Sequence, residues 1–330
     1  MDAPLLSRRT FFALSAAAVA GACRRPPYDP GGFSVPDVSP VAILPAASYD
    51  VDLSDVIARG LRELGVDVAG KRVLLKPNLV EYEPGTVINT HPNMVVGAAI
   101  ALKRAGAREV VVAEGPGHRR DIEYLITNTG LFDHLREERT PFVDLNHDDV
   151  RLTRLRSWFT GLESLSLPVA VLDADLVVSM PKLKTHHWAG MTCSMKNLFG
   201  VVPGSVYGWP KNLLHLQGIE QSILDLNATV RPRLSIVDAI VGMEGDGPIM
   251  GTAKPVGAVL MGTDLVAVDA TAARMIGLRP ERIPYIAEAR RFLGNVATER
   301  IELRGEPLDR FVSPFNVLPP FAHLRVDAAL

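Results

Sequence analysis

The sequence predicts an α/β fold in which a mostly parallel sheet is flanked by helices, a Rossmann-like three-layer architecture. Short apolar runs alternate with single helical patterns, and strands joined by single helices imply right-handed crossovers between parallel neighbours. Polar or charged residues follow nearly every apolar run, at the carboxyl ends where open parallel sheets bind ligands. No loop matches a phosphate-loop or dinucleotide fingerprint, so a dinucleotide site is not part of the prediction.

Each predicted strand is a short apolar run bounded by turn residues. The strands are expected at 41–44, 72–75, 110–113, 177–180, 234–237 and 256–261. The predicted helices end or begin at recognisable signals: Gly106 and Gly277 are stops, and Asp264 is an N-cap. The helices are expected at 54–64, 93–104, 212–226 and 264–276. We expect residues 41–330 to form a single domain.

The first 23 residues resemble a twin-arginine export signal. Arg8 and Arg9 precede an apolar run that is too short to span a bilayer and ends in small residues. Small residues directly before Cys23 resemble a lipoprotein processing site, so we expect either lipidation of Cys23 or simple cleavage near it. Residues 24–40 are rich in proline and glycine and are expected as a tether. The protein is therefore expected in the periplasm or cell envelope, with the twin-arginine machinery as a partner.

Composition narrows the possible partners. The chain has 35 Lys and Arg against 37 Asp and Glu, so no overall basic field indicates nucleic acid as a partner. Membrane contact is expected only through the signal or a lipid anchor. Of the two cysteines, Cys193 has no partner in the mature chain, which excludes a disulfide framework and a cysteine-based iron-sulfur site. The sequence identifies no cofactor.

The densest group of chemistry-bearing side chains follows the predicted strand 177–180. Lys182 and Lys184 alternate with other residues, which places both amines on one side if the segment is extended. His186 adds a group that titrates near neutral pH. Such a cluster suits a phosphate or carboxylate ligand, with a lysine of lowered pKa or His186 as general base. A solvated edge loop is the alternative interpretation.

Two further lysines, Lys76 and Lys196, are candidates for the same site. Lys76 and Asn78 flank Pro77, which fixes the backbone and holds both side chains in defined directions. An ordinary exit from the strand is the alternative. Lys196 and Asn197 precede a turn, where Lys196 either joins the same anion site or interacts with a helix-end dipole.

The acidic candidates also follow strands. Glu114 comes after the strand at 110–113, and Asp238 after the strand at 234–237. Glu244 opens a turn-rich loop in which Gly245 and Gly247 would let backbone amides approach a ligand. A metal or organometallic site is a weaker alternative, because no ligand spacing typical of zinc or calcium occurs. Its candidates are His118, His186, Glu244 and Asp246.

Five motifs occur in a fixed order along the chain. They are Lys76-Pro77-Asn78, Glu114-Gly115-Pro116, Pro181-Lys182-Leu183-Lys184-Thr185-His186, Lys196-Asn197-Leu198-Phe199-Gly200 and the segment 238–248. Together, from about Ala42 to Gly277, they resemble the family described as domain of unknown function 362. Many relatives add a cysteine-rich ferredoxin module, which this chain lacks, so an iron-sulfur cluster is not expected. The resemblance supports the fold and the pocket and implies no particular reaction.

We therefore predict one cleft at the carboxyl edge of the sheet. The predicted catalytic residues are Lys76, Glu114, Lys182, Lys184 and His186. The predicted ligand-binding residues are Asn78, Lys196, Asn197, Asp238, Glu244, Gly245 and Gly247. Such a cleft suits an exported enzyme that acts on a small anionic ligand. A non-catalytic ligand-binding or cofactor-binding protein of the cell envelope is the alternative.

Overall fold

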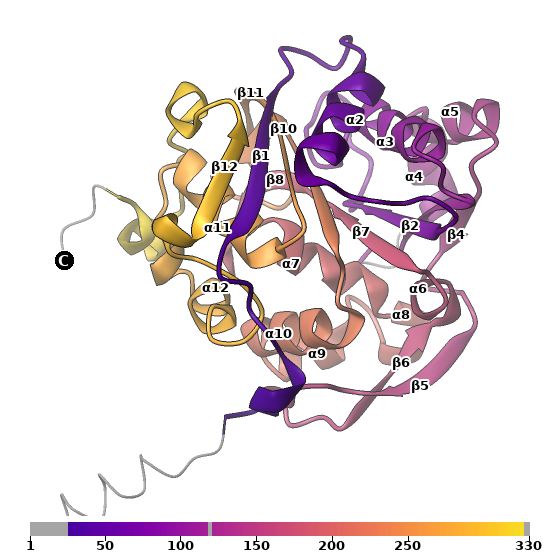
Figure 1. Ribbon diagram of the computed structural model, residues 1–330. Helices are drawn as coiled ribbons and strands as arrows, with labels where there is room; N and C mark the ends of the chain where they lie inside the picture. Colours follow the sequence, from indigo (N-terminus) through magenta and orange to yellow (C-terminus); the bar gives the residue numbers. More distant parts are fainter. Residues whose placement is uncertain (1–25, 118–120, 327–330) are drawn as a thin grey trace, which may run out of the picture.

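The computed structural model describes residues 26–117 and 121–326 of the chain (Figure 1). The expected export signal, the lipidation candidate Cys23 and the metal candidate His118 lie outside these residues. Within them the main sheet has ten strands, in the order β12-β1-β11-β10-β7-β2-β3-β4, with β8 paired to β10 and β9 to β8. The strands are β1 Ser39–Pro45, β2 Arg72–Pro77, β3 Glu109–Glu114, β4 Phe142–Asp144, β7 Leu176–Met180, β8 Lys182–His186, β9 Gly190–Thr192, β10 Leu234–Glu244, β11 Thr252–Gly262 and β12 Ile301–Gly305.

Helices cover both faces of this sheet and give the predicted three layers (Figure 1). One layer contains α2 (Leu53–Leu64), α3 (Pro92–Arg104), α4 (Ile122–Asn128) and α5 (Leu131–Glu137). The other contains α7 (Ser194–Asn197), α10 (Ile219–Val230), α11 (Leu265–Met275) and α12 (Pro284–Ala289). A separate two-stranded sheet, β5 (Val150–Arg154) and β6 (Ser164–Pro168), packs beside this second layer.

The apolar strand residues alternate between the two layers. Val73 and Leu75 of β2 pack with α2 and α3, whereas Leu74 packs on the opposite face against the β5–β6 side. This is the period of two that a strand buried on both faces requires. The α/β class is therefore confirmed, with a mixed sheet of mostly parallel strands.

All six predicted strands lie within observed ones, but the direction of β11 differs from the expectation. β10 and β11 pair antiparallel, and β1 pairs antiparallel with β11 on the other side. Along the main path β11 alone runs against its neighbours. The residues after it, up to Asp264, therefore lie at the opposite edge of the sheet from the ends of β2, β3, β7 and β10. From the sequence, the polar residues after 256–261 were expected at the same carboxyl edge as those after the other strands, and the antiparallel pairing of β11 shows that this expectation was wrong.

Two other segments differ in detail from the expectation. The helix expected at 212–226 is two helices, α9 (Asn212–Leu216) and α10, because Gly218 between them has φ 98°, outside the helical region. The segment expected as a tether packs on the body from Tyr28, whose ring stacks on Phe292 with centroids 4.1 Å apart. Among the described residues, no helix has the length and apolar character needed to cross a membrane.

Candidate functional site

A cavity of about 340 Å³ lies at the carboxyl edge of the parallel strands. Residues from the ends of β2 and β3, from the loop after β8, and from the segment 196–215 form its walls. The predicted residues that line it are Lys76, Asn78, Glu114, His186, Lys196 and Asn197. Its volume lies at the lower end of the range typical of small-molecule sites.

The other predicted residues lie elsewhere. Lys182 and Asp238 form a separate ion pair with 2.5 Å between Nζ and Oδ2. Glu244 accepts a hydrogen bond from the backbone of Asn316 and lies 3.7 Å from Lys254. Lys184, Gly245 and Gly247 do not line the cavity either, so the structure brings together six of the twelve residues of the predicted cleft.

Lys76 and Glu114 form a buried ion pair at the base of the cavity. The Lys76 ammonium donates to both Glu114 carboxylate oxygens, at 2.7 and 2.8 Å, and to Asn197 Oδ1 at 3.2 Å. The same two oxygens accept the backbone N–H groups of Gly115 and Leu79. Burial lowers the pKa of Lys76, and the Glu114 charge opposes that effect. Since four hydrogen bonds, two of them from Lys76, occupy the four acceptor positions of Glu114, the geometry disfavours the predicted proton transfer by this carboxylate.

Gly200 lies directly against this ion pair. A Cβ atom at this position would lie 2.0 Å from Glu114 Oε1 and 2.4 Å from Lys76 Nζ. Only glycine allows the backbone to approach the pair so closely. The turn after α7 is thereby held over the ends of β2 and β3.

Lys182 belongs to a second, fully connected polar cluster. Its ammonium donates to Asp238, to the Tyr49 hydroxyl at 2.7 Å and to the Val241 carbonyl at 3.1 Å. Tyr49 in turn donates to Asp238 and stacks on His91, with ring centroids 3.8 Å apart. All three ammonium protons of Lys182 have acceptors, so this cluster fastens β8 and β10 to the start of α3.

Lys184 is also buried, but carbonyl groups are its acceptors. Its ammonium donates to the Ile88 and Pro248 carbonyls at 2.7 and 3.3 Å. Burial first, and then repulsion by Lys196 and Lys182, lowers its pKa well below the usual value. As predicted from their alternation, Lys182 and Lys184 face the same side, toward the segment that precedes α3. That side is not the cavity.

His186 presents a hydrogen-bond donor to the cavity. Its Nδ1 accepts the backbone N–H groups of Trp188 and Ala189, at 3.0 and 3.2 Å, so the neutral ring carries its proton on Nε2. Burial, with repulsion by Lys196, lowers the pKa of His186 well below its usual value. The ring is therefore neutral at pH 7, and its acceptor nitrogen is already occupied. This tautomer fits ligand binding better than the general-base role that the sequence suggested.

Lys196 and Lys211 are the two amines that the cavity can use. Lys196 Nζ lies 5.2 Å from the centroid of the Phe199 ring, and no acceptor among the described residues bonds it. Burial and repulsion by Lys76 lower the pKa of Lys196 to about 8. Lys211 donates to the carbonyls of Val202 and Gly200 and to Asn146 Oδ1 at 3.4 Å, all of them uncharged acceptors, and burial lowers its pKa to about 7. Neither amine forms an ion pair with a described carboxylate.

Sequence reasoning missed Lys211 and Thr192. Lys211 stands alone at the start of a predicted helix, with no neighbouring motif, and becomes buried only because the chain closes over Glu114. Thr192 is 3% exposed and lines the cavity, yet no described group bonds its hydroxyl. The side-chain oxygen Oδ1 of Asn78, also in the cavity wall, is likewise unbonded among the described residues. Buried polar atoms without partners at a cavity are the atoms that a ligand would satisfy.

The site has no metal-binding cluster among the described residues. Within 26–117 and 121–326, no three His, Cys, Asp or Glu side chains are grouped so that they could hold an ion. The Nδ1 of His186 accepts backbone N–H groups, and Asp246 pairs with His187 at 3.2 Å. The mouth of the cavity is instead partly aromatic: Trp188 is 59% exposed and its ring packs against that of His215. The wall thus combines cationic and neutral donors with apolar surface.

Comparison with known proteins covers the same region. A family model, domain of unknown function (DUF362), matches residues 73–274. The thylakoid-associated protein sll1697 of Synechocystis sp. is 31% identical over 231 residues, which are 67% of this chain and 68% of that protein. The residues matched by the family model include Lys76, Glu114, His186, Lys196 and Lys211.

Two solved structures are more distantly similar. The lactate racemase apoprotein of Thermoanaerobacterium thermosaccharolyticum has a TM-score of 0.44 at 14% identity, covering 74% of this chain and 59% of that one. A Thermotoga maritima protein has a TM-score of 0.39 at 14% identity, covering 68% of this chain and 57% of that one. This chain spans less than two thirds of either structure.

Proposed function

This chain belongs to the family described as domain of unknown function (DUF362), and from that premise we propose that it is an enzyme acting on a small anionic ligand. The ligand carries a phosphate or carboxylate group, which Lys196, Lys211 and the Nε2–H of His186 bind in the cavity. One observation carries the proposal: two buried amines without carboxylate partners line the same small cavity. An anion would supply the missing counter-charge.

The walls suggest what else the ligand contains. Phe199, Pro210 and Trp188 give the cavity apolar surface next to the two amines. A compact acid with a flat or apolar body would therefore fill it better than a bare inorganic ion. Thr192 and Asn78 would bond polar atoms on that body, one as a hydroxyl and the other as a carbonyl acceptor.

Among the residues that line the cavity, a lysine is the best candidate for proton transfer. The oxygens of Glu114 are fully bonded, and His186 is held as a neutral donor. Lys211, whose pKa is about 7, is present in both protonation states near neutral pH. A general acid or base is most effective when its pKa is close to the working pH. We assign the proton-transfer role to Lys211 and anion binding chiefly to Lys196.

Removing either amine should weaken anion binding. We expect Lys196→Met and Lys211→Met each to lower the affinity for benzoate and phenyl phosphate at least about tenfold, since a hydrogen bond to a charged group contributes about 1.5–3 kcal/mol. Isothermal titration calorimetry of the purified variants measures this. Lys254→Met, which removes a lysine outside the cavity, is the matched control and should bind like the parent. Parent-like affinity in both cavity variants would refute the proposal.

Anion affinity should fall as the pH rises. Both amines bind anions only when protonated, and their pKa values are lowered to about 8 for Lys196 and about 7 for Lys211. Benzoate stays ionised, so its affinity should decrease from about pH 6 to about pH 9, by at most about tenfold per pH unit for each proton required. Calorimetry in two buffers of different ionisation enthalpy should detect proton uptake on binding. An affinity independent of pH over this interval would contradict the assignment.

A non-catalytic binding protein is the second candidate. It is favoured by the finding that both acid–base groups predicted from the sequence, Glu114 and His186, are occupied by structural hydrogen bonds. Mass spectrometry of a co-purified ligand, repeated after prolonged incubation with the protein, separates the two: an enzyme converts it, and a carrier returns it unchanged. In either case the proposal includes export to the periplasm or cell envelope, as residues 1–23 suggest.

A further inference from the structure

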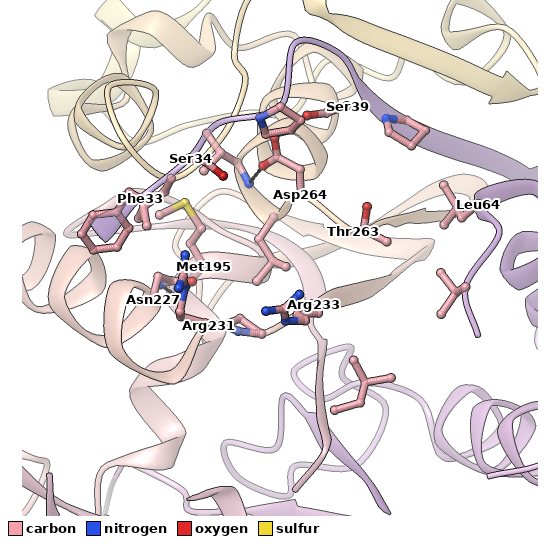
Figure 2. Close-up of a pocket in the computed structure, with 18 of the residues that line it drawn as sticks. Phe33, Ser34, Ser39, Leu64, Met195, Asn227, Arg231, Arg233, Thr263 and Asp264 are labelled. Atoms are coloured by element: carbon pink, nitrogen blue, oxygen red, sulfur yellow. Dashed lines mark hydrogen bonds between the residues drawn. The ribbon is translucent and has the colours of Figure 1, made fainter. Parts of the chain in front are cut away.

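A second cavity, of about 530 Å³, lies at the opposite edge of the sheet (Figure 2). It is bounded by the end of α2, the connection between α10 and β10, the start of α11, and the segment from Phe33 to Pro40. In Figure 2, Arg231 and Arg233 lie across the cavity from Ser39 and Asp264. This is the edge to which the reversed direction of β11 carries Asp264. None of these residues belongs to the predicted cleft or to the first cavity, which Lys196 and Lys211 line and which is called the lysine cavity below.

Three arginines gather here without an acidic partner. Arg231 and Arg233 line the cavity, and Arg156 lies beside them across the Phe33 ring. The guanidinium carbons of Arg156 and Arg231 lie 5.6 and 5.5 Å from the Phe33 centroid. No carboxylate of the described residues forms an ion pair with any of the three. Contact with an aromatic face attracts a cation but does not neutralise it.

The nearby carboxylates, Asp264 and Asp67, accept hydrogen bonds from other groups. Asp264 accepts from the Ser39 hydroxyl and from the backbone N–H groups of Asn295, Val266 and Ala267. It therefore caps α11 and ties it to β1. Asp67 accepts the backbone N–H of Ala69. The arginines are left to repel one another, and burial together with Arg156 and Arg233 lowers the pKa of Arg231.

Arg231 is also held in an unusual backbone conformation. Its φ of 52° and ψ of 57° are left-handed, a region that residues with a side chain rarely adopt. Arg231 lies at the carboxyl end of α10, where the helix dipole stabilises one cation. The dipole does not explain why three cations gather there. Strain and like-charge crowding at one cavity are features that mark functional positions.

We propose that Arg231 and Arg233, with Arg156 beside them, bind a phosphate group in this second cavity. Planar guanidinium groups bind phosphate oxygens through paired N–H donors, and several guanidiniums match its charge. The group belongs either to a soluble phosphate ester or to a phospholipid headgroup. The lipid source has its own support, because Tyr28, a few residues after the expected lipidation site, stacks on Phe292, which lines this cavity. The backbone N–H of the neighbouring Trp158 donates to the Pro27 carbonyl, and Trp158 is 48% exposed.

The test uses the full chain carrying Lys196→Met and Lys211→Met, so that binding in the lysine cavity does not contribute. This background is compared with the same chain carrying Arg231→Gln and Arg233→Gln as well. In one arm, calorimetry measures the affinity for inorganic phosphate and glycerol phosphate. In the other, sedimentation measures binding to phosphatidylglycerol vesicles and to phosphatidylcholine vesicles. Arg310→Gln, which removes an exposed arginine elsewhere, is the matched control.

We expect the two arginine substitutions to lower the affinity at least about tenfold in one arm, since each removes charge-assisted hydrogen bonds. Loss in the calorimetric arm identifies a soluble phosphate ester, and loss only for phosphatidylglycerol vesicles identifies an anionic lipid headgroup. Equal binding with and without the arginine substitutions in both arms overturns the proposal, as does the absence of binding in both. The outcome is independent of the lysine cavity, since both proteins lack its two amines.

Discussion

Replacing Glu114 by glutamine should lower the free energy of unfolding by about 3–5 kcal/mol. The Glu114 side chain is 2% exposed and the Lys76 side chain 1% exposed, so water cannot solvate the ammonium once its counter-charge is removed. Glutamine retains one carbonyl acceptor but presents an NH₂ group where the second carboxylate oxygen accepts two hydrogen bonds. Equilibrium unfolding in urea at pH 7, compared with the parent, measures the loss.

Two comparisons identify the buried charge as the cause. The double variant Lys76→Met with Glu114→Gln removes both charges and should recover most of the lost stability, because an unpaired buried charge is costlier than no charge. Glu281→Gln breaks an exposed pair with Arg274, which spans 2.9 Å, and should change stability by less than about 1 kcal/mol. If Glu114→Gln is no more harmful than Glu281→Gln, the ion pair does not anchor the strand ends.

The elements that were predictable from the sequence are those set by local pattern. Apolar runs at 72–75 and 110–113 become β2 and β3 because a strand buried on both faces must be continuously apolar. Their polar ends meet, as predicted, because neighbouring parallel strands end at the same edge. The direction of each strand was harder to predict from the sequence. β10 extends to Glu244 and β11 begins at Thr252, so residues 245–251 are too short for a crossover. The residues that extend β10 are largely apolar, but those that extend β11, at 252–255, form no apolar run.

The site was only partly predictable because burial and pairing are tertiary properties. The sequence shows that Lys182 and Lys196 are both close to strand ends, but not that Lys182 meets Asp238 and Tyr49 while Lys196 meets only an aromatic ring. Lys211 carries no local signal at all. Its importance comes from the closure of the segment after α7, which places its amine against the carbonyls of Gly200 and Val202.

Gly200→Ala should be the most damaging small substitution at the lysine cavity. Its new methyl group would lie 2.0 Å from Glu114 Oε1 and 2.4 Å from Lys76 Nζ, so either the backbone or the ion pair must move. The pair is held by backbone donors that follow the two strands, and it cannot yield without losing hydrogen bonds. We expect the free energy of unfolding to fall by at least about 2 kcal/mol, in the upper range for an overpacked site. Because the Gly200 carbonyl accepts from Lys211, benzoate affinity should fall as well.

Gly117→Ala provides the control that separates crowding from the general effect of replacing glycine. Gly117 lines the same cavity, and a Cβ atom there would have no neighbour within 4 Å among the described residues. Alanine at this position should leave stability within about 0.5 kcal/mol of the parent, or raise it slightly by restricting the unfolded chain. Urea unfolding and benzoate calorimetry on the two variants give the comparison. Equal stability and equal affinity for Gly200→Ala and Gly117→Ala would mean that the turn after α7 does not need its close approach to Lys76 and Glu114.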